Sequence, residues 1–254
     1  MVMINIYNIF AEKIFCSNNI MYRFMPVSVF DVEGTGRKGI RGKSKQKESS
    51  RNAYSPFPLD VCEHIVQFYL RDKFVIFDPF AGWGERGAMC EKYEKVYLGY
   101  DISPTAIEYA KKHFGVNNLL GDSRVDDILP HDGLITCPPY FNLEKYDGEK
   151  NMSRIKTWGE FLNDYKKVWK RCVDNAYPDA TYCIVVADFR KEGTFYNLSF
   201  ETQRIMKELG MECVDKVILS QKKKVCYRIM LPQCKRLGYS AKVHQYLLVF
   251  KKRI

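Results

Sequence analysis

The chain has 254 residues, of which 46% are hydrophobic, and this length and composition predict a globular protein with one full α/β core. No apolar run approaches the ~20 residues of a membrane-spanning helix, so we expect neither a membrane segment nor a signal peptide. The nine cysteines include no Cys-x-x-Cys pair, which argues against a disulfide framework or a zinc ribbon and predicts the reducing cytoplasm.

The net charge of +10 is unevenly distributed along the chain. Residues 37–51 contain seven Lys or Arg and one acid, and residues 221–242 contain seven and no acid. Basic charge gathered in two non-periodic segments is typical of a phosphate-binding surface, so we favour a nucleic-acid partner over a merely solvated surface. The residues predicted to contact nucleic acid are Arg37, Lys38, Lys222, Lys223, Lys224 and Arg228.

The N-terminal 54 residues are predicted to form an extension. Residues 1–30 have no clear pattern, although residues 5–15 allow a short helix. Residues 31–56 are polar, basic and rich in Gly and Ser, which predicts a flexible loop. Pro58, followed by apolar residues at helical spacing, predicts an amphipathic helix with proline in its first turn. We therefore place the main domain over residues 55–254.

From residue 74 onward, predicted strands and helices alternate, which indicates a parallel sheet with helices on both faces. The predicted strands are 74–79, 95–101, 117–121, 132–137, 180–187, 211–219 and 245–251. The predicted helices are 84–93, 104–114, 158–176 and 198–209. Residues 221–243 are predicted to join the last two strands.

The first of these strands ends at Asp78-Pro79, because proline has no N–H to donate to a sheet. Gly82 and Gly84 then allow a sharp turn and a close approach to a ligand before a helix begins. Asp101 ends the second strand at a position 23 residues after Asp78, which is near the spacing that places a carboxylate on a ribose in a βαβ unit.

The third and fourth strands end at Asp122 and at the run Cys137-Pro138-Pro139-Tyr140. The carboxyl ends of parallel strands share one edge of the sheet, where open α/β sheets bind their ligands. The four strand ends therefore predict one ligand site.

These motifs resemble those of the S-adenosylmethionine-dependent DNA amino-methyltransferases, which modify adenine N6 or cytosine N4. The run Asp-Pro-Phe-Ala-Gly-x-Gly at 78–84 resembles the cofactor motif of that family, and Thr-Cys-Pro-Pro-Tyr at 136–140 resembles its catalytic Asp/Asn/Ser-Pro-Pro-Tyr motif. Residues 185–190 and 244–250 resemble its fifth and last strands. The resemblance covers residues 55–254 and implies a class I methyltransferase (Rossmann-like) fold: a mostly parallel, seven-stranded sheet with an antiparallel last strand.

The resemblance also implies S-adenosylmethionine as the cofactor. By this likeness Gly82 and Gly84 pass beneath its methionine part, Asp101 holds the ribose and Asp122 meets the adenine. The run Ser-Pro-Phe-Pro at 55–58 loosely resembles a further cofactor-contacting motif of the family. The residues predicted to bind the cofactor are Ser55, Phe57, Asp78, Phe80, Gly82, Gly84, Asp101 and Asp122.

The implied reaction is direct methyl transfer to the exocyclic amine of a flipped base in double-stranded DNA, without a metal ion. Such an amine is a poor nucleophile because its lone pair is delocalised into the ring, and acceptors for both of its hydrogens free that lone pair. In the family these acceptors are the side chain before the prolines and a backbone carbonyl, while the aromatic residue stacks on the base, which is worth ~1–3 kcal/mol. The predicted catalytic residues are Cys137, Pro138, Pro139 and Tyr140.

Cys137 departs from the pattern, because a thiol is a weak hydrogen-bond acceptor. Its size, close to that of serine, tilts the target slightly toward cytosine N4 and leaves adenine N6 open. A cysteine nucleophile of the carbon-5 cytosine type is disfavoured, because that class carries Pro-Cys rather than Cys-Pro.

Two alternative functions remain: an RNA amino-methyltransferase, and a DNA-binding protein that keeps the fold without catalysis. The compact architecture suits an orphan or phage-borne enzyme. It leaves open a homodimer and a partner restriction enzyme.

Overall fold

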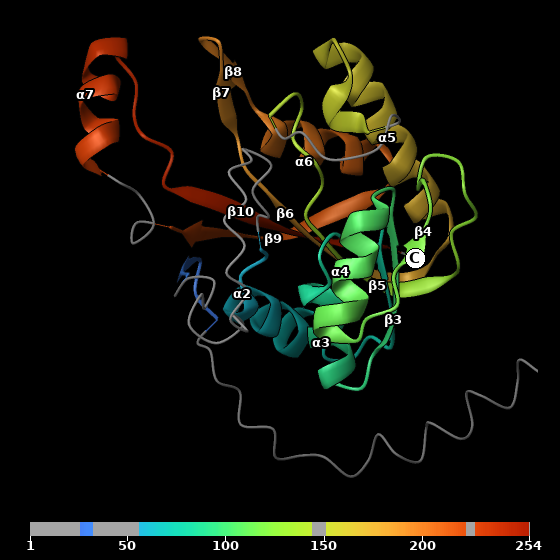
Figure 1. The fold of residues 1–254 in the computed structure, drawn as a ribbon. Helices are drawn as coiled ribbons and strands as arrows, with labels where there is room; N and C mark the ends of the chain where they lie inside the picture. The colour runs from blue at the N-terminus through green and yellow to red at the C-terminus, as the bar shows by residue number, and fades with distance from the viewer. Residues whose placement is uncertain (1–25, 33–55, 144–150, 222–226, 254) are drawn as a thin grey trace, which may run out of the picture.

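The computed structural model describes residues 26–32, 56–143, 151–221 and 227–253. An eight-stranded sheet runs through their centre, in the order β1-β9-β10-β6-β5-β2-β3-β4 (Figure 1). Its strands are β1 (Val29–Asp31), β2 (Val75–Asp78), β3 (Val96–Asp101), β4 (Leu119–Leu120), β5 (His131–Thr136), β6 (Ala176–Val186), β9 (Met211–Ser220) and β10 (His244–Lys252).

The sheet is mostly parallel, and β10 runs antiparallel to both of its neighbours, β6 and β9. The predicted class I methyltransferase architecture is therefore confirmed. The predicted number of seven strands is corrected to eight, because β1 pairs in parallel with β9 from Val29 opposite Ile218 to Asp31 opposite Ser220. Since β1 lies within residues 1–54, the segment assigned to an extension contributes a strand to the sheet.

Helices cover both faces of the sheet (Figure 1). One face packs against α5 (Trp158–Asp174) and α6 (Leu198–Glu208), and the other packs against α2 (Leu59–His64), its continuation as a π-helix (Ile65–Tyr69), and α3 (Glu85–Lys92). Neighbouring strand residues enter opposite cores: Ile76 joins the α2 side and Phe77 the α5 side. This alternation follows from the two-residue period of a strand.

The helix boundaries have local causes. Proline occupies the first turn of α4 (Pro104–Phe114), and the Ser103 hydroxyl accepts a hydrogen bond from the Ala106 amide at 3.2 Å, as the sequence Ser-Pro predicts. Thr157 caps α5 in the same way, by accepting from the Glu160 amide. These caps fix where each helix begins and hence where the preceding strand-end loops lie.

Two elements lie outside the predicted pattern. Residues after β6 form a hairpin of β7 (Phe189–Lys191) and β8 (Thr194–Tyr196). Residues 221–243 are more than a connection, because they contain the helix α7 (Tyr227–Leu237). Both elements project from one end of the sheet in Figure 1. None of the helices within the described ranges combines the length and the apolar character that crossing a membrane requires.

Candidate active site

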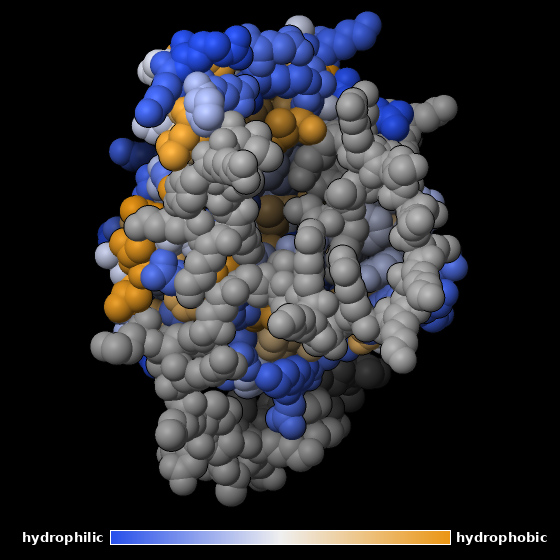
Figure 2. All heavy atoms as spheres, turned by 60° about the vertical axis from the view of Figure 1, so that its left-hand side comes forward, coloured by the Kyte–Doolittle hydropathy of each residue, from blue (hydrophilic) through white to orange (hydrophobic). Residues whose placement is uncertain are grey.

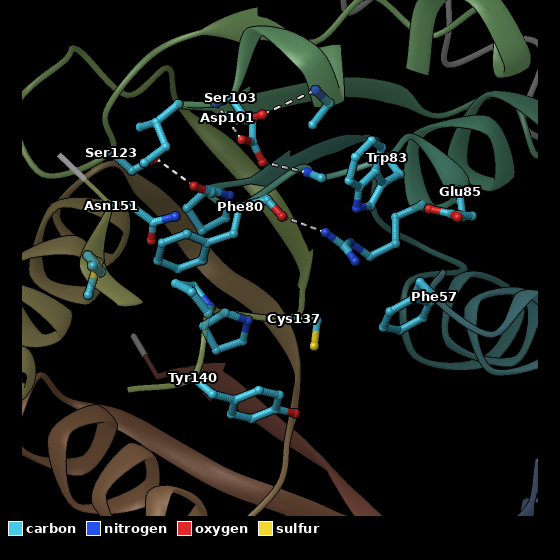
Figure 3. Close-up of a pocket in the computed structure, with 18 of the residues that line it drawn as sticks. Phe57, Phe80, Trp83, Glu85, Asp101, Ser103, Ser123, Cys137, Tyr140 and Asn151 are labelled. Atoms are coloured by element: carbon cyan, nitrogen blue, oxygen red, sulfur yellow. Dashed lines mark hydrogen bonds between the residues drawn. The ribbon is translucent and has the colours of Figure 1, made fainter. Parts of the chain in front are cut away.

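A cavity of about 390 Å³ opens at the carboxyl ends of β2, β3, β4 and β5, as the pattern of strand ends predicts (Figure 3). Nine residues that the sequence singled out line it together: Phe57, Phe80, Gly82, Asp101, Asp122, Cys137, Pro138, Pro139 and Tyr140. Asp78 and Gly84 lie outside the cavity wall. Ser55 falls outside the described residues.

Asp78, a predicted cofactor contact, is completely buried beneath the wall, where it supports neighbouring elements. Its carboxylate accepts hydrogen bonds from Arg86 Nε at 2.6 Å, from the Tyr97 hydroxyl at 2.9 Å and from Thr136 Oγ1 at 2.6 Å. A buried carboxylate is tolerated only when it is paired and hydrogen-bonded in this way. The pairing ties the end of β2 to α3, β3 and β5.

The two glycines of the turn have different roles. Gly82 lines the cavity at φ +58°, and its amide donates to Asp101 Oδ2 at 2.7 Å. Gly84 has φ +104°, and a Cβ there would lie 2.8 Å from Ala110 Cβ. Gly82 therefore brings the backbone to the cavity, as predicted. Gly84 instead allows α3 and α4 to approach closely.

Asp101 is at the end of β3 and lines the cavity. Its carboxylate accepts from the amides of Gly82 at 2.7 Å and Ser103 at 2.9 Å. Burial raises the pKa of Asp101 above its ordinary value, although these two backbone hydrogen bonds act in the opposite direction. A carboxylate has about four acceptor positions, so the two amides leave capacity for a pair of hydroxyl groups.

Asp122 lines the same cavity but is already engaged by a neighbour. Arg124 donates to both of its oxygens, with Nη2 at 2.7 Å from Oδ2 and Nε at 2.9 Å from Oδ1. Nη1 of Arg124 also reaches Asp164 on α5 at 2.7 Å. The loop after β4 is thereby held against α5, and Asp122 offers a ligand only the acceptor positions that Arg124 leaves.

The Cys137-Pro138-Pro139-Tyr140 run follows β5 directly and forms another part of the wall (Figure 3). Tyr140 is 8% exposed, and its ring packs against the edge of Phe189 at the start of the β7–β8 hairpin, with centroids 5.8 Å apart. Gln245 Nε2 donates to the Tyr140 hydroxyl at 3.2 Å, and Gln221 Nε2 donates to Gln245 Oε1 at 2.9 Å. Two glutamines from β10 and the end of β9 thus hold the Tyr140 ring.

Sequence reasoning missed several residues of the wall, including Glu85, Arg86, Asn151, Gln221 and Gln245. For Glu85 and Arg86 a signal was available, because they directly follow the glycine turn. The glutamines are near Tyr140 only through the order of the strands, since Gln245 is 105 residues away in the chain.

Of the predicted nucleic-acid contacts, Arg37, Lys38 and Lys222–Lys224 lie outside the described residues, and Arg228 is in α7. Arg190 on β7 is another basic residue near this end of the sheet, and its guanidinium lies over the rings of Phe195 at 4.8 Å and Tyr239 at 4.4 Å. Lys242 lies over the same Phe195 ring at 5.6 Å. Figure 2 shows hydrophilic side chains along the top of the molecule, at the height that α7 and the β7–β8 hairpin have in Figure 1.

Comparison with known proteins identifies a family. Residues 36–112 match the family model described as DNA methylase, of the N6/N4 type. The type II methyltransferase M.AccI of Acinetobacter calcoaceticus is 28% identical over 113 residues, which are 41% of this chain and 21% of that protein. The chain therefore spans about a fifth of the length of the curated relative that it matches.

Solved structures share the fold at low sequence identity. TrmN from Thermus thermophilus has a TM-score of 0.50 at 12% identity, covering 77% of this chain and 49% of that one. The 1,6-didemethyltoxoflavin-N1-methyltransferase of Burkholderia thailandensis has a TM-score of 0.50 at 14% identity, covering 77% and 78%. The family predicted from the sequence is thus supported over residues 36–112, which match the N6/N4 DNA methylase model, and the predicted fold, that of class I methyltransferases, is confirmed.

Proposed function

We propose that this protein transfers a methyl group from S-adenosylmethionine to the exocyclic amine of a DNA base, at cytosine N4 or adenine N6. One observation carries the proposal. A single cavity joins Gly82 and Asp101, which suit the cofactor, to the run Cys137–Tyr140, which suits a substrate amine. The family match supports DNA as the substrate.

The side chains of the cavity fit the implied cofactor in charge. Among the described residues, its wall carries three carboxylates, those of Glu85, Asp101 and Asp122, against two guanidinium groups, those of Arg86 and Arg124. A wall with net negative charge suits a sulfonium cofactor that is itself net positive, although the chain as a whole carries +10. Phe57, Phe80 and Trp83 provide apolar faces for the adenine. When bound, the cofactor supplies the electrophilic methyl group.

The residues after β5 suit activation of an amine. Cys137 precedes two prolines, which have no N–H groups to compete for its backbone carbonyl, so this carbonyl can accept an amine hydrogen. The ring of Tyr140 provides a face for an extruded base, and the hydrogen bond from Gln245 fixes its orientation. The chain thus holds the amine nucleophile and a hydrogen-bond acceptor for it, the methyl group comes from the cofactor, and the proton that the methylated amine loses goes to solvent.

The position of the basic groups supports a duplex with one base turned into the cavity. Arg190 and Lys242 are at the hairpin whose first residue, Phe189, contacts Tyr140.

Neutralising Lys222–Lys224 should reduce the slope of log affinity for DNA against log salt concentration by up to about three phosphate contacts. An unchanged slope would assign that lysine run to a solvated surface.

We place the protein in the cytoplasm, where its seven described free cysteines would stay reduced.

Mass spectrometry of nucleosides tests the function. The protein is incubated with S-adenosylmethionine and with duplex DNA, single-stranded DNA or RNA, and the products are hydrolysed. We expect N4-methylcytosine or N6-methyladenine from the duplex. Methylated nucleosides from RNA alone would establish the RNA alternative. Cofactor binding without any methylated product would establish a DNA-binding protein that has lost catalysis.

Two variants separate direct transfer from a covalent mechanism. Cys137→Ser should remain active, because serine keeps the size of the thiol and is a better acceptor. Tyr140→Ala should lose most methyl transfer but still bind the cofactor, since misplacement of a reacting group by 1 Å can cost ~100-fold. An inactive Cys137→Ser protein, together with a covalent adduct between wild type and DNA containing 5-fluorocytosine, would refute direct transfer to an amine.

A further inference from the structure

The β7–β8 hairpin presents two faces with different partners. A two-residue turn at 192–193, with positive φ at both positions, sets the register of its strands. Phe189 pairs with Tyr196, and the next pair is Arg190 with Phe195. Because successive residues of a strand point to opposite sides, the two pairs lie on opposite faces of the hairpin.

The inner face fixes the hairpin beside the part of the cavity that Tyr140 lines. The ring of Phe189 stacks on that of Tyr196 with centroids 5.1 Å apart, and it packs against Tyr140 at 5.8 Å. Tyr196 in turn packs against Trp158, the first residue of α5, at 5.0 Å. The outer face is therefore held at a set place next to the proposed platform for an extruded base.

The outer face gathers two cations around one aromatic ring. The guanidinium of Arg190 lies 4.8 Å from the ring of Phe195 and 4.4 Å from that of Tyr239, which follows the turn at Gly238 that ends α7. The ammonium of Lys242 lies 5.6 Å from the same Phe195 ring. Phe195 is nevertheless 44% exposed, so a partner can reach this face.

The positive charge of this face is not balanced within the protein. Among the residues that the structure describes, Arg190 forms no ion pair. The carboxylate that approaches Lys242 is that of Asp188, at 3.9 Å, and its other oxygen accepts from the Ser199 amide at 2.8 Å. Burial lowers the pKa of Lys242, and the charge of Arg190 acts in the same direction, whereas Asp188 opposes both. Two neighbouring cations that disfavour each other leave a place for an anion.

We propose that Arg190 and Lys242 bind a backbone phosphate of the DNA strand whose base enters the cavity. Guanidinium and ammonium groups are the usual donors to DNA phosphates, and the rings of Phe195 and Tyr239 hold them in position. Since Phe189 joins this face to Tyr140, the phosphate contact aligns the strand with the catalytic run. The inference rests on the proposed function, because it takes DNA as the substrate. The competing explanation is that Arg190 only ties the segment after α7 to the hairpin.

Binding of a fluorescently labelled DNA duplex, followed by anisotropy at several salt concentrations, separates the two explanations. Arg190→Gln should weaken binding about tenfold and should reduce the slope of log affinity against log salt concentration by about one phosphate contact. Arg190→Lys keeps the charge and should keep the slope. A role confined to tying the segment predicts an unchanged slope in Arg190→Gln, with lower stability in urea.

Arg71→Gln is the matched control, because it removes the same charge from an exposed turn before β2, at the edge of the sheet away from the cavity. It should leave the slope as in wild type. Equal slopes in Arg190→Gln and Arg71→Gln would overturn the inference. If Arg190→Gln fails to fold, Lys242→Gln decides by the same criterion. Affinity for S-adenosylmethionine should stay within about twofold of wild type in each variant, since none of these side chains lines the cavity.

Methyl transfer at saturating duplex tests the placement of the phosphate. If the contact aligns the strand that carries the target base, Arg190→Gln should turn over roughly tenfold more slowly even when all the protein is bound to DNA. Turnover equal to that of wild type would place the phosphate elsewhere on the duplex and overturn the inference. Wild-type protein that methylates no nucleic acid would instead refute the proposed function, a result that is independent of the difference in slope between the variants.

Discussion

At the scale of single residues, the Asp78–Arg86 pair connects stability to the site. Asp78 is buried completely and joins four parts of the chain, while Arg86 faces the cavity. A pair of this kind adds little stability when compared with apolar residues of similar size. Removing one partner is nevertheless costly, because it leaves a buried charge uncompensated.

Asp78→Asn should therefore destabilise the protein by about 3–5 kcal/mol, the usual cost of breaking a buried ion pair. Urea unfolding of the variant and wild type measures the difference. Asp174→Asn is the control, because its exposed carboxylate pairs with Lys170 on the surface of α5 and should matter little. Equal stability of Asp78→Asn and wild type would mean that Arg86 finds another counter-charge.

Asp101→Ala should weaken binding of S-adenosylmethionine by roughly 1.5–3 kcal/mol, the increment of a hydrogen bond to a charged group. The structure adds a second effect, because the same carboxylate holds the amides of Gly82 and Ser103. Asp101→Asn keeps one acceptor oxygen and should lose less. Calorimetric titration of both variants with S-adenosylmethionine checks which of them loses more affinity. Unchanged affinity in folded Asp101→Ala would remove Asp101 from the site.

Most of the site could be predicted because strand ends in a parallel sheet share one edge. Asp101 and Cys137 end apolar runs, so their meeting follows from local patterns. Arg86 and Gln245 do not end such runs. Arg86 could still have been found from its position directly after the glycine turn, whereas Gln245 reaches Tyr140 only because β10 inserts between β6 and β9.

At the scale of elements, segments with clear boundary signals were predicted well, whereas α7 and the short strands were not. The helix predicted over residues 104–114 coincides with α4 because Ser103-Pro104 and Gly115 mark both ends. β1 has three residues, of which only Phe30 is buried, and its partner strand lies some 190 residues away in the chain. The β7–β8 hairpin is also missed, since its turn at Glu192-Gly193 lies in a short polar stretch.

The packing of α3 on α4 gives a prediction at this scale. Gly84→Ala places a Cβ 2.8 Å from Ala110 Cβ at a backbone φ of +104°, so both overpacking and strain should destabilise the protein. We expect a loss of roughly 2–4 kcal/mol in the free energy of unfolding. Chemical denaturation measures it.

Gly115→Ala is the matched control for that variant. Its φ is +76°, but no atom lies within 4 Å of the added Cβ, so only backbone strain of about 1 kcal/mol applies. Equal losses in the two variants would show that close packing of the helices adds nothing to the requirement for glycine at position 84.

At the scale of the whole molecule, the net charge of the chain and the charge of the cavity wall differ in sign. The chain carries +10 in total, whereas the wall of the cavity has more carboxylates than guanidinium groups. The net charge favours a polyanion as partner, whereas the described part of the cavity wall favours a cationic ligand.

His131, in the buried core, should make the free energy of unfolding depend on pH. This side chain is fully buried, its Nδ1 donates to the Leu129 carbonyl at 2.9 Å, and its Nε2 faces the Tyr182 hydroxyl at 2.7 Å. Burial lowers the pKa of His131 to about 4. The unfolded chain, in which histidine has its ordinary pKa of about 6.5, therefore binds a proton that the native state does not bind between these two values.

The contribution of His131 to the free energy of unfolding should be fully present above about pH 6.5. It should decline as the pH falls toward 4, by roughly 3 kcal/mol in all. Urea unfolding at pH 7 and at pH 4.5 tests this, with His131→Gln and the exposed His113→Gln compared with wild type. Carboxylates also titrate in this range, so the difference between proteins isolates the histidine. His131→Gln should be less stable at pH 7 but lose less on acidification, whereas His113→Gln should follow wild type. If His131→Gln and wild type lose the same stability between the two pH values, the ring is protonated in the native core and donates from both nitrogens.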